Sequence, residues 1–258
     1  MAKNRVELLG CPVDNLSMKE ALSEIDSYIR SRAPHQHVAI NVRKVVGSYF
    51  SAELRNVVRQ CDLALADGQP IVWATRMLGK SLKGRVTGID LMQSLLERAA
   101  ACGYRVFLLG ARQEVLEKVV RHYQRDYPAL QIVGYRDGYW LPAQDMQVVE
   151  KIHKSQPDIL IVAMGSPKKE FFVSKYRDHM RVPFAMGVGG SFDVIAGAVT
   201  RAPSYWQRAG FEWFWRFLHE PFRLGRRYLV DAFIFGFLLA REYCRYRLAR
   251  VHTTRLSG

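Results

Sequence analysis

The carboxylate best placed for chemistry in this sequence is Asp67, at the end of the apolar run 63–66. Gly68 follows it directly, and Pro70 then opens a helical pattern. A strand that ends in this way delivers its carboxylate to the carboxyl edge of a parallel sheet, where open α/β folds bind their ligands. An Asp-Gly pair is also typical of a simple turn, so both interpretations stay open at this point.

Three further apolar runs end in glycine just before a helical pattern, and such turns suit phosphate binding. Glycine lets a ligand approach the backbone, and the helix that follows offers unpaired N–H groups to a phosphate. One such turn is as readily an ordinary connection, but three at one edge favour a nucleotide or sugar-nucleotide site. None has the G-x-G-x-x-G spacing, and G-x-x-x-x-G-K-[ST] is absent from the sequence, which disfavours a dinucleotide oxidoreductase or a P-loop NTPase. The glycines are Gly110, Gly165, Gly187, Gly189 and Gly190.

Three polar residues flank these turns, and each has two interpretations. Asp193 suits hydrogen bonds from ribose hydroxyls, or it caps its own helix. Asn41 suits a sugar or acceptor contact, or a helix cap. Arg85 suits neutralisation of a diphosphate, or it is a solvated surface arginine. His35 and His37 alternate on one strand without a third ligand near them in the sequence, so we expect structural rather than metal-binding roles.

These residues need a sheet whose strands end at one edge, and the apolar pattern predicts one. Apolar runs of strand length alternate with amphipathic stretches, as in a parallel sheet with helices on both faces. We expect an α/β, doubly wound, Rossmann-like domain over 1–197 and a helical appendage over 198–258. The strands are expected at 6–9, 38–40, 63–65, 106–109, 132–133, 159–163 and 184–188, and the helices near 17–31, 42–60, 70–79, 89–102, 112–126, 142–154 and 167–179. Ser17 and Glu20 have the spacing of a capping box.

The appendage differs from the rest of the chain in composition. Residues 201–258 contain 11 arginines, no lysine and 4 acidic residues, which amounts to half of the net charge of +14, and 14 of the 30 aromatic residues. Within it, 228–240 is apolar except for Asp231, and 13 residues are too few for the ~20 of a spanning helix. The flanking arginines suit a segment that lies in the lipid headgroup plane. Packing on the core, or in the interface of a homo-oligomer, is the alternative.

The remaining composition narrows the class of protein. The chain begins without the apolar segment of a secretory signal, and its four cysteines are widely spaced without a C-x-x-C pair. We therefore expect an intracellular protein with reduced thiols, and no metal site or cofactor. Arginine and aromatic residues alternate as in some RNA-binding proteins, but the sequence has no RRM-type stacking motif, so we expect no nucleic-acid partner.

In their order along the chain, these motifs resemble the WecG/TagA/CpsF family of bacterial glycosyltransferases (glycosyltransferase family 26). The likeness runs from about residue 5 to about residue 228. It is carried by Asp67-Gly68, Arg85-Val-x-Gly88-x-Asp90-Leu, Gly165-x-Pro-Lys168-x-Glu170, Gly187-x-Gly-Gly-x-Phe-Asp193, Arg201-Ala-Pro and Glu212-Trp-x-x-Arg216…Glu220-Pro-x-Arg223.

The resemblance implies an inverting, metal-independent transfer of a hexose-type sugar from a UDP-sugar to a polyprenyl-diphosphate-linked saccharide. Such enzymes act peripherally at the cytoplasmic face of the inner membrane, against its anionic leaflet, and contribute to teichoic acid, capsule or exopolysaccharide. By the same resemblance, Asp67 is the general base, Asn41 lies in the pocket and Arg85 assists with phosphates. Asp193 lies on the nucleotide side. The appendage arginines that close over the diphosphate are Arg216, Arg223 and Arg226.

Two positions depart from the family pattern, and both bear on the donor. Ala39 stands where the family often has Thr, and Lys169 where it usually has Gln. Both lie near the expected donor sugar or nucleotide, so a UDP-N-acetylmannosamine type of donor and UDP-glucose, as in a xanthan-type exopolysaccharide pathway, both stay open. A hypothesis of another class also stays open, namely a non-catalytic basic module that docks on anionic lipid or nucleic acid through the appendage.

Overall fold

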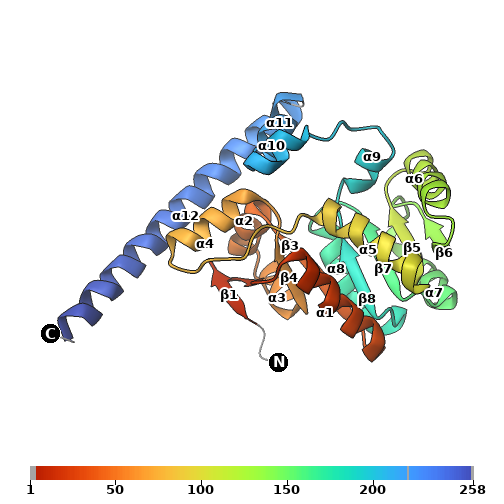
Figure 1. The fold of residues 1–258 in the computed structure, drawn as a ribbon, viewed down its shortest axis with the longest axis horizontal. Helices are drawn as coiled ribbons and strands as arrows, with labels where there is room; N and C mark the ends of the chain where they lie inside the picture. The colour runs from red at the N-terminus through yellow and green to blue at the C-terminus, as the bar shows by residue number, and fades with distance from the viewer. Residues whose placement is uncertain (1–3, 220, 257–258) are drawn as a thin grey trace.

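The computed structural model describes residues 4–219 and 221–256, and its centre is a six-stranded sheet (Figure 1). Neighbouring strands are all parallel, in the order β4-β3-β8-β7-β5-β6. The predicted Rossmann-like α/β class is therefore confirmed. Because the strands share one direction, their carboxyl ends meet at a single edge. The strands are β3 (His35–Ile40), β4 (Leu63–Ala66), β5 (Arg105–Gly110), β6 (Gln131–Arg136), β7 (Ile159–Ala163) and β8 (Phe184–Gly187).

Helices cover both faces of this sheet, and the strand residues divide between them by alternation. Leu63 and Leu65 belong to one core, whereas Ala64 and Ala66 belong to the core on the other face. This follows from the two-residue period of a strand. The first core is covered by α1 (Met18–Ser31), α5 (Gly88–Cys102) and α6 (Gln113–Asp126); the opposite face is covered by α2 (Val42–Phe50), α3 (Ala52–Gln60), α4 (Gln69–Met77), α7 (Asp145–Ser155) and α8 (Lys168–Met180).

The strand predicted at 6–9 does not join the main sheet. It is β1 (Arg5–Leu8), which pairs antiparallel with β2 (Cys11–Asp14) in a separate hairpin. The chain reverses at Leu9 and Gly10, both of which have positive φ, as a two-residue hairpin turn requires. Buried Asp14 then accepts a hydrogen bond of 2.7 Å from the Ala64 N–H, which attaches the hairpin to the outer edge of β4.

The predicted helix over 42–60 is two helices in the structure. α2 ends at Phe50, and the Ser51 side chain accepts a hydrogen bond of 3.1 Å from the Leu54 N–H at the start of α3. A serine can cap a new helix in this way, and the apolar pattern alone does not show the break. The capping box predicted at Ser17 and Glu20 is confirmed at the start of α1.

Beyond residue 198 the described chain is helical, with α10 (Ser204–Ala209), α11 (Glu212–His219) and the long α12 (Pro221–Leu256). α12 crosses α2 and extends past the α/β part toward the C-terminus (Figure 1). Phe235 belongs to the same core cluster as Val45 of α2, Leu238 is buried, and Asp231 pairs with Arg43 at 3.1 Å. One face of α12 is therefore fixed to the core. Among the described residues, no helix combines the length and apolar character that crossing a membrane requires.

The imidazole of His37 makes the stability of this fold depend on pH. His37 is buried on β3 beside Phe184, and neither ring nitrogen has a hydrogen-bond partner among the described residues. Burial lowers the pKa of His37 from 6.5 to about 3. The unfolded chain binds a proton below its ordinary pKa, so it binds more protons than the fold between these two values. Stability therefore falls as the pH drops through this window.

We expect His37→Leu to remove up to about 1.4 kcal/mol per pH unit of this dependence, measured by urea unfolding between pH 6.5 and pH 4. His179→Leu, on the exposed side of α8, is the matched control and should retain the wild-type slope. An unchanged slope in His37→Leu would contradict a buried, neutral ring.

Candidate active site at the carboxyl edge of the sheet

Asp67 and Asn41 lie side by side because they leave adjacent strands at the same level. Ile40 of β3 and Ala66 of β4 are register partners, and each strand ends there. The Asn41 amide Nδ2 donates to Asp67 Oδ2 at 3.3 Å, and the Gly88 N–H at the start of α5 donates to Asp67 Oδ1 at 3.4 Å. Each oxygen of the half-buried Asp67 carboxylate therefore accepts one hydrogen bond, and the two bonds fix its orientation.

The structure confirms the helix-cap interpretation of Asn41, and the sugar or acceptor contact stays a prediction. The Asn41 side-chain Oδ1 accepts a hydrogen bond of 3.0 Å from the Lys44 N–H, which caps α2, while its Nδ2 contacts Asp67. Asp67-Gly68 is a turn, since Gly68 has a φ of 120° and leads into α4, and the role of Asp67 in a site stays a prediction. The cap orients the Asn41 side chain, and the turn places Asp67 just before α4.

Arg85 connects the strand edge to the appendage. Val86 N–H donates to the carbonyl of Ala66 at 2.9 Å, so the segment runs beside the end of β4. The Arg85 guanidinium donates to the carbonyl of Gln207 in α10. Arg201 in turn pairs with Asp90, near the start of α5. The motif that carries Arg85 is thus attached to the appendage at two points.

The glycine turns all lie at this carboxyl edge, but they differ in what surrounds them. At Gly110 a Cβ would meet the carbonyl oxygen of Ala163 at 2.4 Å, so packing against β7 already explains this glycine. Gly165 and Gly189 have open space where a Cβ would stand. These two glycines therefore leave room for a ligand, whereas Gly110 has a structural reason of its own.

Gly187 and Gly190 lie beside two of the predicted polar residues. A Cβ on Gly187 would meet the aliphatic part of Lys169 at 2.8 Å, so the lysine side chain lies across this turn. A Cβ on Gly190 would lie 3.6 Å from Asp193 Oδ2. Asp193 lies in the short α9 (Ser191–Ile195), and its carboxylate has no hydrogen-bond or ion-pair partner within residues 4–219 and 221–256 as described. Its backbone carbonyl accepts hydrogen bonds from the N–H groups of Ala198 and Val199, at 2.9 and 3.1 Å.

A buried charge cluster next to Asn41 escaped the analysis of the sequence. Lys44 Nζ, on a side chain only 4% exposed, lies 2.6 Å from Glu170 Oε1 and donates to Ser166 Oγ at 2.6 Å. Lys169 Nζ reaches the same Glu170 oxygen at 3.0 Å. The cluster therefore joins the start of α2, the turn after β7 and the start of α8. One signal was present, since Lys44 and Ser48 share the apolar face of α2 at helical spacing.

The two lysines keep Glu170 ionised. Burial alone would raise its pKa, but the positive charges of Lys169 and Lys44 outweigh burial and lower it. Burial lowers the pKa of Lys44, against the opposing effect of Glu170. With two lysines and one carboxylate, the cluster carries a net positive charge at the edge where a phosphate would bind.

The described part of the structure shows no contact between the three appendage arginines predicted for the diphosphate and this edge of the sheet. Arg226 is exposed on α12. The side chains of Arg216 and Arg223 lie outside the described residues, so their predicted closure over a diphosphate stays a prediction. Among the described residues, no three His, Cys, Asp or Glu side chains are grouped as a metal site would need.

Comparison with known proteins identifies relatives over most of the chain. The family model described as "Glycosyl transferase WecG/TagA/CpsF family" matches residues 6–249. The chain is also similar to an N-acetylglucosaminyldiphosphoundecaprenol N-acetyl-β-D-mannosaminyltransferase of Bacillus spizizenii. The two are 39% identical over 178 residues, which cover 69% of this chain and 68% of that protein.

The buried cluster predicts a large effect of neutralising Lys44. We expect Lys44→Met to reduce the free energy of unfolding by roughly 3–5 kcal/mol, because it removes one partner of a buried charge pair. Lys19→Met, at an exposed position of α1, is the matched control and should change it by no more than about 0.5 kcal/mol. Equal unfolding midpoints in urea for the two variants would contradict a stabilising role of the cluster.

Proposed function

The chain belongs to the WecG/TagA/CpsF family of glycosyltransferases, and from that premise we propose a specific reaction. The protein transfers a hexose-type sugar from a UDP-sugar to a polyprenyl-diphosphate-linked saccharide, with inversion and without a metal. The product serves the synthesis of a cell-surface polysaccharide. The name of the Bacillus relative, which combines a mannosaminyl donor group with a diphosphoundecaprenol acceptor, supports this choice. The family also favours an enzyme over the non-catalytic docking module.

The contact between Asp67, Asn41 and Gly88 carries the proposal. A general base must be ionised and directed at the proton that it removes. Asn41 and Gly88 both donate to the Asp67 carboxylate, which sets its direction. Asp67 takes the proton of the acceptor hydroxyl as that oxygen attacks the anomeric carbon. The bond from this carbon to the UDP oxygen breaks, and UDP leaves on the opposite side.

The groups at the neighbouring turns would receive the charge of the leaving UDP. The open turns at Gly165 and Gly189 let a diphosphate approach the backbone, and the Lys169 side chain lies against Gly187, two residues before Gly189. Arg85 lies half-buried at the same edge, where a fixed cation acts more strongly than in water. The sequence has no D-x-D pair of the kind that binds a metal–diphosphate complex. In this proposal Lys169 and Arg85 take the part of a metal ion. The appendage arginines predicted to join them are Arg216, Arg223 and Arg226.

The proposed donor is UDP-glucose or a UDP-N-acetylmannosamine type of sugar, and two residues bear on the choice. Ala39 lies on β3, one residue before its last position, and offers no hydroxyl to a donor. Lys169 pairs with Glu170 at 3.0 Å and places an ammonium group where an amide is usual in the family. Both donor types therefore stay in the proposal.

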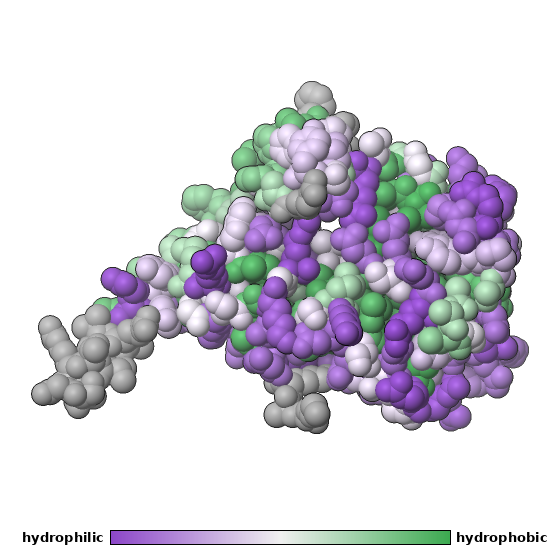
Figure 2. Space-filling view, viewed as in Figure 1, coloured by the Kyte–Doolittle hydropathy of each residue, from purple (hydrophilic) through white to green (hydrophobic). Residues whose placement is uncertain are grey.

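The appendage supports a peripheral position at the cytoplasmic face of the membrane. Leu229, Phe233 and Phe237 follow one another at four-residue intervals on α12 and are 69%, 78% and 63% exposed. Figure 2 shows apolar side chains gathered along the upper edge of the molecule, over α11 and the adjoining part of α12. We call Leu229, Phe233 and Phe237 the apolar stripe of α12. Exposed Arg226 and Arg241 flank it, so that apolar burial and attraction to anionic lipid act together.

We expect Asp67→Asn to lower kcat by about 10²- to 10⁴-fold with little change in KM for the donor, because an amide cannot accept the proton. The assay is transfer from UDP-glucose to a synthetic prenyl-diphosphate sugar in the presence of EDTA. Asp178→Asn, on the exposed side of α8, is the control and should match the wild type. Rates near wild type for Asp67→Asn would remove the proposed base, and loss of wild-type activity in EDTA would remove the metal-free mechanism.

Nucleotide binding has its own test, independent of catalysis. UDP at a hundredfold excess over its Kd should stabilise the folded chain by about 2.7 kcal/mol, since it binds only the folded state. The measurement is the thermal unfolding midpoint with and without UDP. Asp67→Asn should keep this shift, and an absence of any shift at millimolar UDP would favour the docking module after all.

A further inference from the structure

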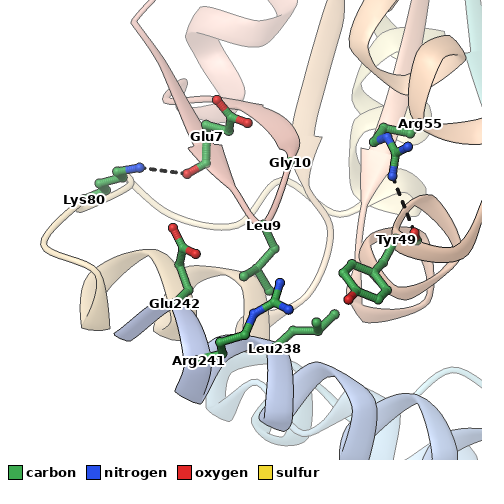
Figure 3. A pocket seen from close by; sticks show the side chains of 9 residues that line it. All are labelled: Glu7, Leu9, Gly10, Tyr49, Arg55, Lys80, Leu238, Arg241 and Glu242. Atoms are coloured by element: carbon green, nitrogen blue, oxygen red, sulfur yellow. Dashed lines mark hydrogen bonds between the residues drawn. The ribbon is translucent and has the colours of Figure 1, made fainter. Parts of the chain in front are cut away.

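A cavity of about 460 Å³ lies away from the carboxyl edge, where α12 crosses the hairpin turn and the end of α2 (Figure 3). None of the residues assigned above to the transfer reaction lines it. Its walls come from the hairpin, α2, α3, the segment after α4, and α12. The lining residues are Glu7, Leu9, Gly10, Tyr49, Arg55, Lys80, Leu238, Arg241 and Glu242.

Three cations of this lining have no carboxylate partner among the described residues. Arg55 donates to the backbone carbonyls of Ser48 and Tyr49, at 3.2 and 3.4 Å. Lys80 Nζ donates to the backbone carbonyl of Glu7 at 2.9 Å. The Arg241 guanidinium lies 5.8 Å from the centre of the Tyr49 ring. These partners are neutral, so they orient the three cations without neutralising their positive charges.

The two carboxylates of the lining are paired with other cations. Glu7 pairs with Arg59 at 3.1 Å, and Glu242 pairs with Arg245 at 3.9 Å. Neither Arg59 nor Arg245 lines the cavity. The cavity therefore has an excess of positive charge, and its complement is an anion with several acceptor oxygens. Arginine matches a phosphate in this way through paired N–H groups.

The mouth of the cavity adjoins exposed apolar side chains. Tyr49 and Phe50 at the end of α2 are 40% and 69% exposed. Phe237 lies one helical turn before Arg241 on α12, and so on the same face of the helix. A free phosphate would gain nothing from these neighbours. A phosphate that carries acyl chains would bury them on the apolar stripe.

We propose that this cavity binds the phosphodiester headgroup of an anionic glycerophospholipid, with the acyl chains lying along the apolar stripe of α12. The inference rests on the proposed docking of α12 at the membrane and adds a defined lipid site to it. The volume falls in the range of about 300–1,000 Å³ of small-molecule sites. Arg241 contacts the phosphate from the membrane side, and Arg55 and Lys80 contact it from the protein side.

The test is Arg241→Gln in the full chain, with Arg247→Gln as the matched control. Both arginines are exposed on α12, but Arg247 does not line the cavity. Removing one surface arginine weakens binding to an anionic bilayer by about fivefold. For vesicles of phosphatidylglycerol in phosphatidylcholine, we expect that loss for Arg247→Gln and a loss of roughly fiftyfold for Arg241→Gln. Lys80→Gln should follow Arg241→Gln, and thermal unfolding midpoints establish that all three variants fold.

Native mass spectrometry of protein released from these vesicles gives the stoichiometry. We expect one phosphatidylglycerol per wild-type or Arg247→Gln chain and none per Arg241→Gln chain. Inorganic phosphate at millimolar concentration should not displace the lipid. Displacement by phosphate alone would identify a free-phosphate site and overturn the lipid assignment.

The outcomes separate this site from the function on which it rests. Equal losses for Arg241→Gln and Arg247→Gln would overturn the headgroup site and leave general surface docking. Failure of the wild-type protein to bind anionic vesicles would overturn both the headgroup site and the docking of α12 on the membrane. Transfer to a short-chain, water-soluble acceptor reports on the enzyme alone, and it should be the same for both arginine variants.

Discussion

The in-register pairing of β3 with β4 is the constraint on which the candidate site depends. Because Ile40 lies opposite Ala66, the next residue of each strand emerges beside the other. Asn41 and Asp67 therefore meet, and the capping bond that Asn41 makes to α2 holds its amide toward the carboxylate. A shift of one residue in either strand would turn alternate side chains to the other face and separate this pair. The register of two strands thus determines whether Asn41 lies beside the proposed base.

The charges at the site are arranged so that the base is not neutralised. Within the described residues Asp67 has no ion-pair partner, and its hydrogen bonds come from an amide and a backbone N–H. Arg85 donates to a backbone carbonyl of the appendage instead. Lys44 and Lys169 share Glu170 on the other side of Asn41. These three cations therefore form no ion pair with the Asp67 carboxylate.

The parts of the fold that follow local rules were predictable from the sequence, and those that depend on distant contacts were not. Alternation of apolar runs predicted the parallel sheet, and the Ser17 capping box was correct to the residue. The hairpin at 5–14 was mistaken for a strand of the main sheet, because an apolar run does not reveal its pairing partner. Asp67 and Asn41 were found through their positions at strand ends. Lys44 was missed because a lysine is buried only when a distant carboxylate, here Glu170, faces it.

α12 connects the proposed membrane surface on one of its faces to the candidate active site through the opposite face, which packs on α2. Asp231 on one face pairs with Arg43, which stands two residues after Asn41 in the first turn of α2. Phe233 and Phe237 on the other face are exposed. Because α2 is fixed to α12 through this ion pair and the shared core, a surface that binds the exposed face also orients the start of α2. The same helix start holds the amide that directs Asp67. Docking on lipid would therefore set the approach of a lipid-linked acceptor relative to the base, without any change of conformation.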